Sequence, residues 1–148
     1  MATPRDDEEF RVAFESCSLD RDDWDHRAHV RLAWLYLREV DLDEATQRMK
    51  DGIFRYDEGT TEICNYHETL TRFWMVRVAQ ALEGAPEGED FDAFLARNPA
   101  LGNKRLVLQY YSQPRVITDE ARDTFVEPDL KPLEDPPEDA PRQVVDLT

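Results

Sequence analysis

The amino-acid sequence predicts an all-α, single-domain helical bundle with short appended helices and an extended acidic tail. Apolar residues recur at intervals of three and four along several segments, which is the period of a helix with one buried face. No stretch alternates between apolar and polar residues over the length of a strand. The 148 residues suffice for one hydrophobic core, and no second domain or internal repeat is indicated.

Composition divides the chain into three parts. Residues 1–5 form a start that we expect to be disordered, and residues 6–133 form the helical domain. Residues 134–148 form an acidic, proline-rich tail with few apolar side chains, a composition typical of disordered segments. The folded body is therefore expected to end near residue 133.

The first two expected helices are marked by apolar stripes and an acidic cap. A short amphipathic helix is expected over residues 6–16, with Phe10 and Phe14 on its inner face. A second helix is expected from Asp25 to about Val40, because an aspartate at this point accepts hydrogen bonds from the free amides of the first turn.

The later helices are marked by caps and breakers. A third helix begins after the acidic cap Asp41 and is expected to give way to a turn at residues 56–61. A fourth extends from about Asn65 to Leu82 and ends at a turn that contains glycine and proline. Three shorter helices are expected, in chain order over residues 91–98, 103–111 and 118–124.

The charge balance restricts the possible partners. With 18 Lys and Arg against 33 Asp and Glu, the net charge is −15, which argues against nucleic acid as a ligand. An acidic surface or tail favours cations or a basic protein partner. Most arginines, Arg77 among them, are expected on solvated faces.

No segment is apolar enough to span a membrane, and we expect a cytoplasmic protein with free thiols.

The three histidines of the chain predict a metal site. His26 and His29 lie on the inner face of the second expected helix, and His67 lies at the start of the fourth. Three neutral imidazoles suit one divalent ion, namely zinc, copper or iron, and leave a coordination position open. Cys64 is a candidate extra ligand, with a role as a small buried apolar residue as the alternative. The alternative is that each histidine bonds a backbone carbonyl or a carboxylate at a helix end.

Polar and aromatic neighbours complete the candidate site. Glu68 and Tyr66 flank His67 and are the candidates for moving protons, although Glu68 could equally cap a helix and Tyr66 could stack in the core. Arg31 or Arg72 could hold a substrate carboxylate. Trp74 could form a wall of an apolar substrate pocket, with a core position as the alternative.

Motifs across the chain resemble those of a group of small bacterial hypothetical proteins. These motifs are W-x-H-x-x-H at residues 24–29, Y-H-E-T-x-T at residues 66–71 and Y-Y-S at residues 110–112. The resemblance implies that the motifs act as one unit and supplies no reaction. The histidines also resemble those of helical bundles of the DinB/YfiT type, in which the third histidine belongs to a later His-x-x-x-His motif. Here the pair comes first and is spaced His-x-x-His.

Two classes of function follow from these residues. In the first, the protein is a small three-histidine, metal-dependent enzyme that acts on a small molecule by redox or hydrolytic chemistry. In the second, it is a non-catalytic helical interaction or regulatory module with structural histidines, and its acidic surface or tail engages a basic partner. Metal content distinguishes the two classes.

Overall fold

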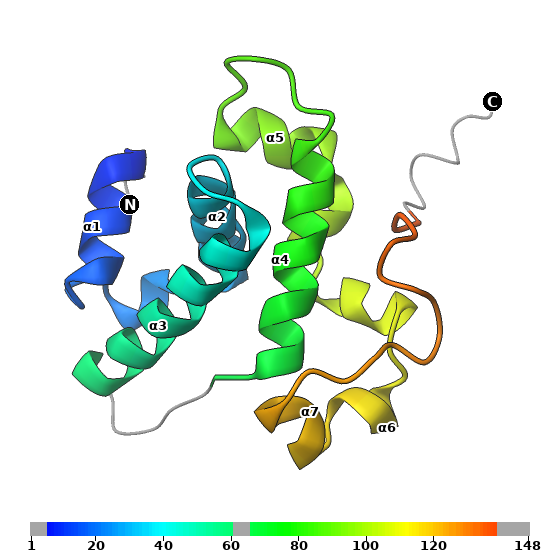
Figure 1. Ribbon diagram of the computed structural model, residues 1–148. Helices are drawn as coiled ribbons and strands as arrows, with labels where there is room; N and C mark the ends of the chain where they lie inside the picture. The colour runs from blue at the N-terminus through cyan, green and yellow to red at the C-terminus, as the bar shows by residue number, and fades with distance from the viewer. Residues whose placement is uncertain (1–5, 61–65, 139–148) are drawn as a thin grey trace.

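The computed structural model describes residues 6–60 and 66–138, and within these ranges the chain forms helices and connecting loops without a strand (Figure 1). The α-helices are α1 (Asp7–Glu15), α2 (His26–Leu37), α3 (Leu42–Thr60), α4 (Glu68–Leu82), α5 (Phe91–Arg97), α6 (Gln113–Val116) and α7 (Asp119–Asp123). The 3-10 helices are η1 (Arg21–Asp23), η2 (Pro99–Gly102) and η3 (Lys104–Gln109). This architecture confirms the predicted all-α bundle.

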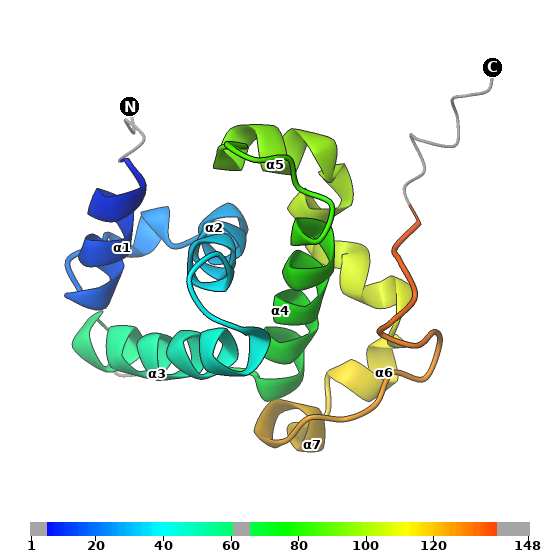
Figure 2. The same ribbon diagram turned by 45° about the horizontal axis from the view of Figure 1, so that its top comes forward.

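Helix α2 is the centre of the fold. It packs against both α3 and α4, which also contact each other, while α1 lies on α3 and α7 lies on α4. Figure 2 shows α2 nearly end-on between these neighbours. The side chains of Val30, Leu32, Trp34 and Tyr36 are all buried, although they point to different sides of the helix. Burial on several sides shows that neighbouring segments enclose much of this helix.

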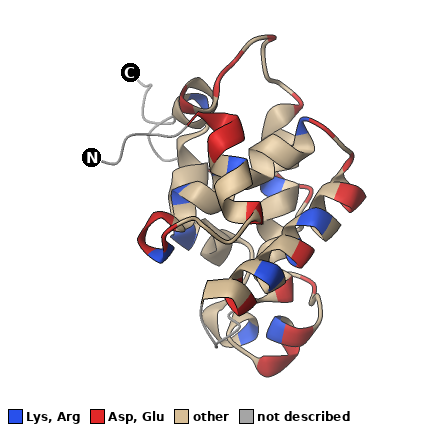
Figure 3. Ribbon diagram, turned by 90° about the vertical axis from the view of Figure 1, so that its left-hand side faces the viewer, with Lys and Arg blue, Asp and Glu red and all other residues tan. Residues whose placement is uncertain are grey.

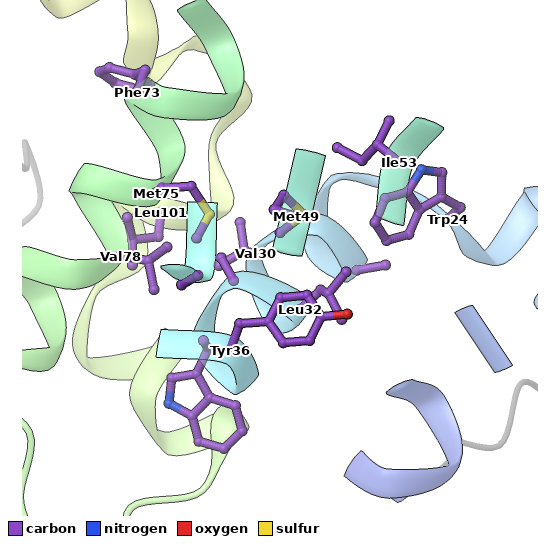
Figure 4. Close-up of a cluster of buried hydrophobic side chains, with 14 of the residues drawn as sticks. Trp24, Val30, Leu32, Tyr36, Met49, Ile53, Phe73, Met75, Val78 and Leu101 are labelled. Carbon is purple, nitrogen blue, oxygen red and sulfur yellow. The ribbon is translucent and has the colours of Figure 1, made fainter. Parts of the chain in front are cut away.

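The core joins the three central helices through large apolar side chains. Figure 4 shows Val30 of α2 close to Met75 and Val78 of α4, with Met49 of α3 beside them. Leu101 of η2 reaches the same cluster from the later part of the chain. Burial of this apolar surface is the main favourable contribution to folding.

Acidic residues at helix starts explain part of the chain's negative charge. The carboxylates of Asp6, Asp25, Asp41 and Asp90 each accept a hydrogen bond from a backbone amide in the first turn of the following helix, at 2.8–2.9 Å. These caps satisfy amides that have no partner inside the helix, and their charge complements the helix dipole. The predicted Asp25 cap is confirmed.

The expected turn at residues 56–61 was wrong for its described part, because α3 continues to Thr60. Tyr56 is fully buried and donates a hydrogen bond to the carbonyl oxygen of Leu19 at 2.6 Å. Gly52 and Gly59 interrupt the sequence pattern, yet they let neighbouring side chains approach: a Cβ at Gly52 would lie 2.7 Å from the Phe14 ring. Tertiary contacts therefore extend the helix past its weak formers.

Two further segments differ from the expected helices. The segment expected as a helix over residues 103–111 forms the 3-10 helix η3, in which the amide of Leu106 bonds the carbonyl of Asn103. Helix α6 was not expected, and Pro114 occupies its first turn, where a missing amide hydrogen costs nothing. The expectations for residues 1–5 and 139–148 lie outside the described residues.

The end of the described chain returns along the body of the fold. Residues 134–138, expected to belong to a disordered tail, carry hydrogen bonds to α4 and η3 through backbone atoms. No helix in residues 6–60 and 66–138 has the length and apolar character needed to cross a membrane.

Candidate functional site

His26 is the first residue of α2 and links that helix to a later part of the chain. Its Nε2 lies 2.9 Å from the backbone carbonyl oxygen of Leu101 in η2, and since a carbonyl only accepts, Nε2 carries the proton and donates it. Its ring meets Trp74 of α4 edge-on, with the ring centres 4.6 Å apart. Burial lowers the pKa of His26, so the imidazole is neutral at neutral pH.

His29 has different neighbours, one turn further along α2. Its Nδ1 donates to the carbonyl oxygen of Asp25 at 2.8 Å. Its ring stacks on Trp24 with the ring centres 3.8 Å apart. Burial lowers the pKa of His29, which again favours the neutral ring.

His67 caps α4 with its side chain. Its Nδ1 accepts a hydrogen bond from the amide of Leu70 at 3.1 Å, and its Nε2 lies 3.1 Å from the carbonyl oxygen of Val116 at the end of α6. An amide only donates and a carbonyl only accepts, so the proton sits on Nε2 and the lone pair on Nδ1 points at Leu70. Burial lowers the pKa of His67.

The structure gives the three histidines separate settings. Their backbone partners are Leu101 in η2, Asp25 just before α2 and Val116 in α6. In the part of the chain that the structure describes, no group of three or more His, Cys, Asp or Glu side chains is placed to hold a metal ion. Cys64 lies outside the described residues. Binding of zinc, copper or iron by His26, His29 and His67 stays a prediction.

Tyr66 and Glu68 do lie together. The Tyr66 hydroxyl donates to Glu68 Oε1 at 2.7 Å, and Lys50 Nζ is 3.3 Å from the same oxygen. Arg72 Nη1 is 3.4 Å from Glu68 Oε2. The half-buried Glu68 carboxylate is thus contacted by the Tyr66 hydroxyl, by Lys50 from α3 and by Arg72 from α4 itself.

In this cluster the pKa values of both candidate proton carriers, Tyr66 and Glu68, lie further from neutral pH than usual. Burial raises the pKa of Tyr66, and the hydrogen bond to Glu68 raises it further. Burial by itself would raise the pKa of Glu68, but the Tyr66 hydroxyl and Lys50 hold it below its usual range. An efficient acid or base has a pKa near the working pH. At neutral pH Tyr66 instead keeps its proton and Glu68 keeps its charge, and the hydroxyl donates to the carboxylate.

The three candidate substrate-binding residues occupy three places. Arg72 belongs to the Glu68 cluster and lies over the ring of Phe125 at 5.2 Å. Arg31 joins α2 to α1, with Nη2 2.8 Å from an oxygen of Asp7. Half-buried Trp74 meets the ring of His26 and packs against the core. The structure therefore brings together Tyr66, Glu68 and Arg72, and separately Trp74 with His26.

Two residues that matter here were missed in the sequence. Lys50 lies on α3, and nothing in its local spacing indicates contact with Glu68. Arg77 was expected on a solvated face, but its side chain is only 2% exposed. A signal was available, because Arg77 stands between Val76 and Val78 in the most apolar part of α4. A charged residue inside such a run is a candidate for burial with specific partners.

Comparisons with known proteins yield no relative: no family model matches the chain, and neither the curated proteins nor the solved structures contain a match.

Proposed function

We propose that the protein is a non-catalytic helical interaction module whose histidines are structural and whose acidic surface engages a basic protein partner. One observation carries this proposal: the polar groups that could act in catalysis are bonded to one another or to the backbone inside the fold. A side chain held in this way positions helices and connecting segments.

The histidine contacts support a structural role. His26 fastens the start of α2 to η2, and His67 both caps α4 and holds the end of α6. These bonds join segments far apart in sequence, so they fix how the later short helices sit on the central helices. Buried polar groups that are fully bonded contribute to a unique arrangement of this kind.

The surface charge supports a basic partner. Several arginines pair with acidic neighbours, and acidic residues exceed basic ones in the chain, 33 to 18. Figure 3 shows acidic and basic segments on one side of the molecule. Around η1 the exposed residues Asp20, Asp22 and Asp23 follow one another closely, and Arg21 pairs with the buried Asp57 at 2.9 Å. This corner presents carboxylates to solvent whose attraction to Lys and Arg falls with added salt.

The test is a binding titration of the full chain with a short fluorescent peptide rich in Lys and Arg, at low and at physiological salt. We expect binding that weakens with salt. Replacing Asp22 and Asp23 by Asn should weaken it by about threefold to tenfold, because each lost charge removes a modest surface attraction.

The matched control replaces Asp119 by Asn and Glu120 by Gln at the start of α7, which removes the same charge elsewhere. Equal weakening by both pairs would show unspecific attraction to an acidic protein. That outcome, or no binding at low salt, would overturn the proposed partner.

A further inference from the structure

Residues 130–138, which we call the strap, are held against the body by contacts to their backbone. The amide of Leu130 donates to the carbonyl oxygen of Tyr110 at 2.9 Å. The Gln109 side chain pairs with Glu138 in both directions: Nε2 donates to its carbonyl oxygen and Oε1 accepts from its amide, both at 2.9 Å. In Figures 1 and 2 the orange strap passes beside the yellow-green segment that contains η3. Residues 109 and 110 therefore contact the strap through its backbone peptide groups.

Arg77 of α4 lies beneath the middle of the strap. Its Nη1 donates to the Tyr110 hydroxyl at 2.6 Å and to the carbonyl oxygen of Asp135 at 3.1 Å. Its Nη2 donates to Gln80 Oε1 at 2.9 Å and to the carbonyl oxygen of Leu133. The hydrogen-bond acceptors around this buried guanidinium are neutral oxygens.

A buried cation ordinarily pairs with a carboxylate. Burial lowers the pKa of Arg77 and the nearby negative charge of Asp135 opposes this, but the strap accepts the hydrogen bonds of the guanidinium through backbone carbonyl oxygens. The Nε of Arg77 is buried and has no hydrogen-bond partner among the described residues. The carbonyl oxygens of Leu133 and Asp135 each occupy one Nη atom. Two oxygens on one guanidinium are what a carboxylate supplies when it binds arginine through both oxygens.

We propose that Arg77, Gln80 and Tyr110 form a peptide-binding site for a free C-terminal carboxylate, and that the strap is its resting occupant. The carboxylate of the incoming peptide replaces the Leu133 and Asp135 carbonyl oxygens on Arg77. The Tyr110 carbonyl oxygen, which now accepts from the Leu130 amide, and the Gln80 side-chain amide, which now donates to the Leu133 carbonyl oxygen, hold the ligand next to its carboxylate. This site is separate from the acidic corner of the proposed function.

Because the strap is tethered, it competes at a high effective concentration and weakens the apparent affinity for any added peptide. Loosening the strap without altering the site should therefore tighten binding. Leu133 is packed against the core, so Leu133→Ser removes an apolar anchor of the strap. Leu130 is 56% exposed, so Leu130→Ser makes the same change in the strap with little loss of packing and serves as the control.

The experiment measures fluorescence anisotropy of a labelled peptide with the sequence of residues 127–133, which places its terminal carboxylate where the Leu133 carbonyl now lies. The same peptide ending in an amide is the comparison. We expect the full-chain Leu133→Ser variant to bind the acid about tenfold more tightly than the amide. The wild type and Leu130→Ser should bind the acid more weakly than Leu133→Ser does.

An Arg77→Lys variant, with its fold checked by circular dichroism, should lose the preference for the acid, because the lysine ammonium cannot bind both carboxylate oxygens side by side as a guanidinium does. If that variant does not fold, the comparison of acid with amide on Leu133→Ser still decides the question. Equal binding of both peptides, no binding, or equal affinities of Leu133→Ser and Leu130→Ser would overturn the proposal. None of these outcomes depends on the basic peptide that tests the proposed function.

Discussion

His67 donates a hydrogen bond from Nε2 to the backbone carbonyl oxygen of Val116, 3.1 Å away, and so joins the start of α4 to the end of α6. The other ring nitrogen accepts from the amide of Leu70. Both contacts require the neutral ring with its proton on Nε2. Protonation of Nδ1 would turn the cap into a clash of two donors.

The stability of the fold should therefore fall at mildly acidic pH. The pKa of His67 is lowered in the folded state, so the unfolded chain takes up the proton first. The contribution of the neutral ring is complete well above a pH of about 6.5, the unfolded value, and is lost as the pH falls through that value towards the folded pKa. His26 and His29 act in the same direction.

Replacement of His67 separates this effect from the others. His67→Asn keeps a side-chain oxygen for the cap but does not titrate, so urea unfolding should show a smaller loss of stability between pH of about 7.5 and 5.5 than in the wild type. His67→Ala should cost about 1 kcal/mol more than His67→Asn at the higher pH. An identical pH dependence in the wild type and His67→Asn would contradict the assigned proton position.

Thr69 should matter for the same region through its hydroxyl. This fully buried side chain donates to the carbonyl oxygen of Thr124 at 2.9 Å and accepts from the amide of Val126 at 3.1 Å. Thr69→Val keeps the shape but leaves both backbone groups buried without that partner, so the free energy of unfolding should drop by about 1–3 kcal/mol. Thr69→Ser keeps the hydroxyl and should cost less. A Thr69→Val variant as stable as the wild type would refute this role.

Gly52 should resist substitution even though it lies inside a helix. Alanine favours a helix over glycine by about 1 kcal/mol. The added Cβ, however, would lie 2.7 Å from Cε2 of Phe14, which is fully buried and stacks on Trp24 with the ring centres 4.4 Å apart. We expect Gly52→Ala to lower the melting temperature, since overpacking costs about 1–3 kcal/mol.

Gly102→Ala is the control for this change, because nothing lies within 4 Å of the added Cβ. A stabilising Gly52→Ala would mean that α1 adjusts its position on α3 at little cost.

Local sequence signals were sufficient for the fold class and for several helix starts. Apolar spacing identified the main helices, and Asp25 and Asp41 were expected as caps and act as caps. The same signals failed at α3, because Gly52 and Gly59 look like breakers. Their lack of a side chain instead permits close contacts with Phe14 and Cys17. Whether a glycine ends a helix or admits a neighbour depends on tertiary packing.

The candidate site was less predictable for a related reason. Glu68 and Arg72 are four residues apart on α4, so their contact follows from helix geometry. Tyr66 precedes the helix, and its contact with Glu68 does not follow from that geometry. The partners of His26 and His67 are carbonyl groups 75 and 49 residues away, and such backbone acceptors leave no mark on the sequence. The sequence therefore shows three histidines near helix starts but not the separate backbone partner of each one.

Metal analysis of untagged protein separates the two functional classes. Coordination by His67 would require the Nδ1 lone pair to leave the Leu70 amide, or Nε2 to give up its proton and leave Val116. His26 would likewise have to release the Leu101 carbonyl if its Nε2 is the ligand. These costs oppose binding, so we expect less than one zinc, copper or iron ion per chain and no rise in melting temperature on adding zinc.

One ion per chain in the wild type, lost in His26→Ala, His29→Ala and His67→Ala variants that keep their helical spectrum, would establish the three-histidine metal site instead. The imidazoles would then have to converge to within about 2.0–2.1 Å of a single ion.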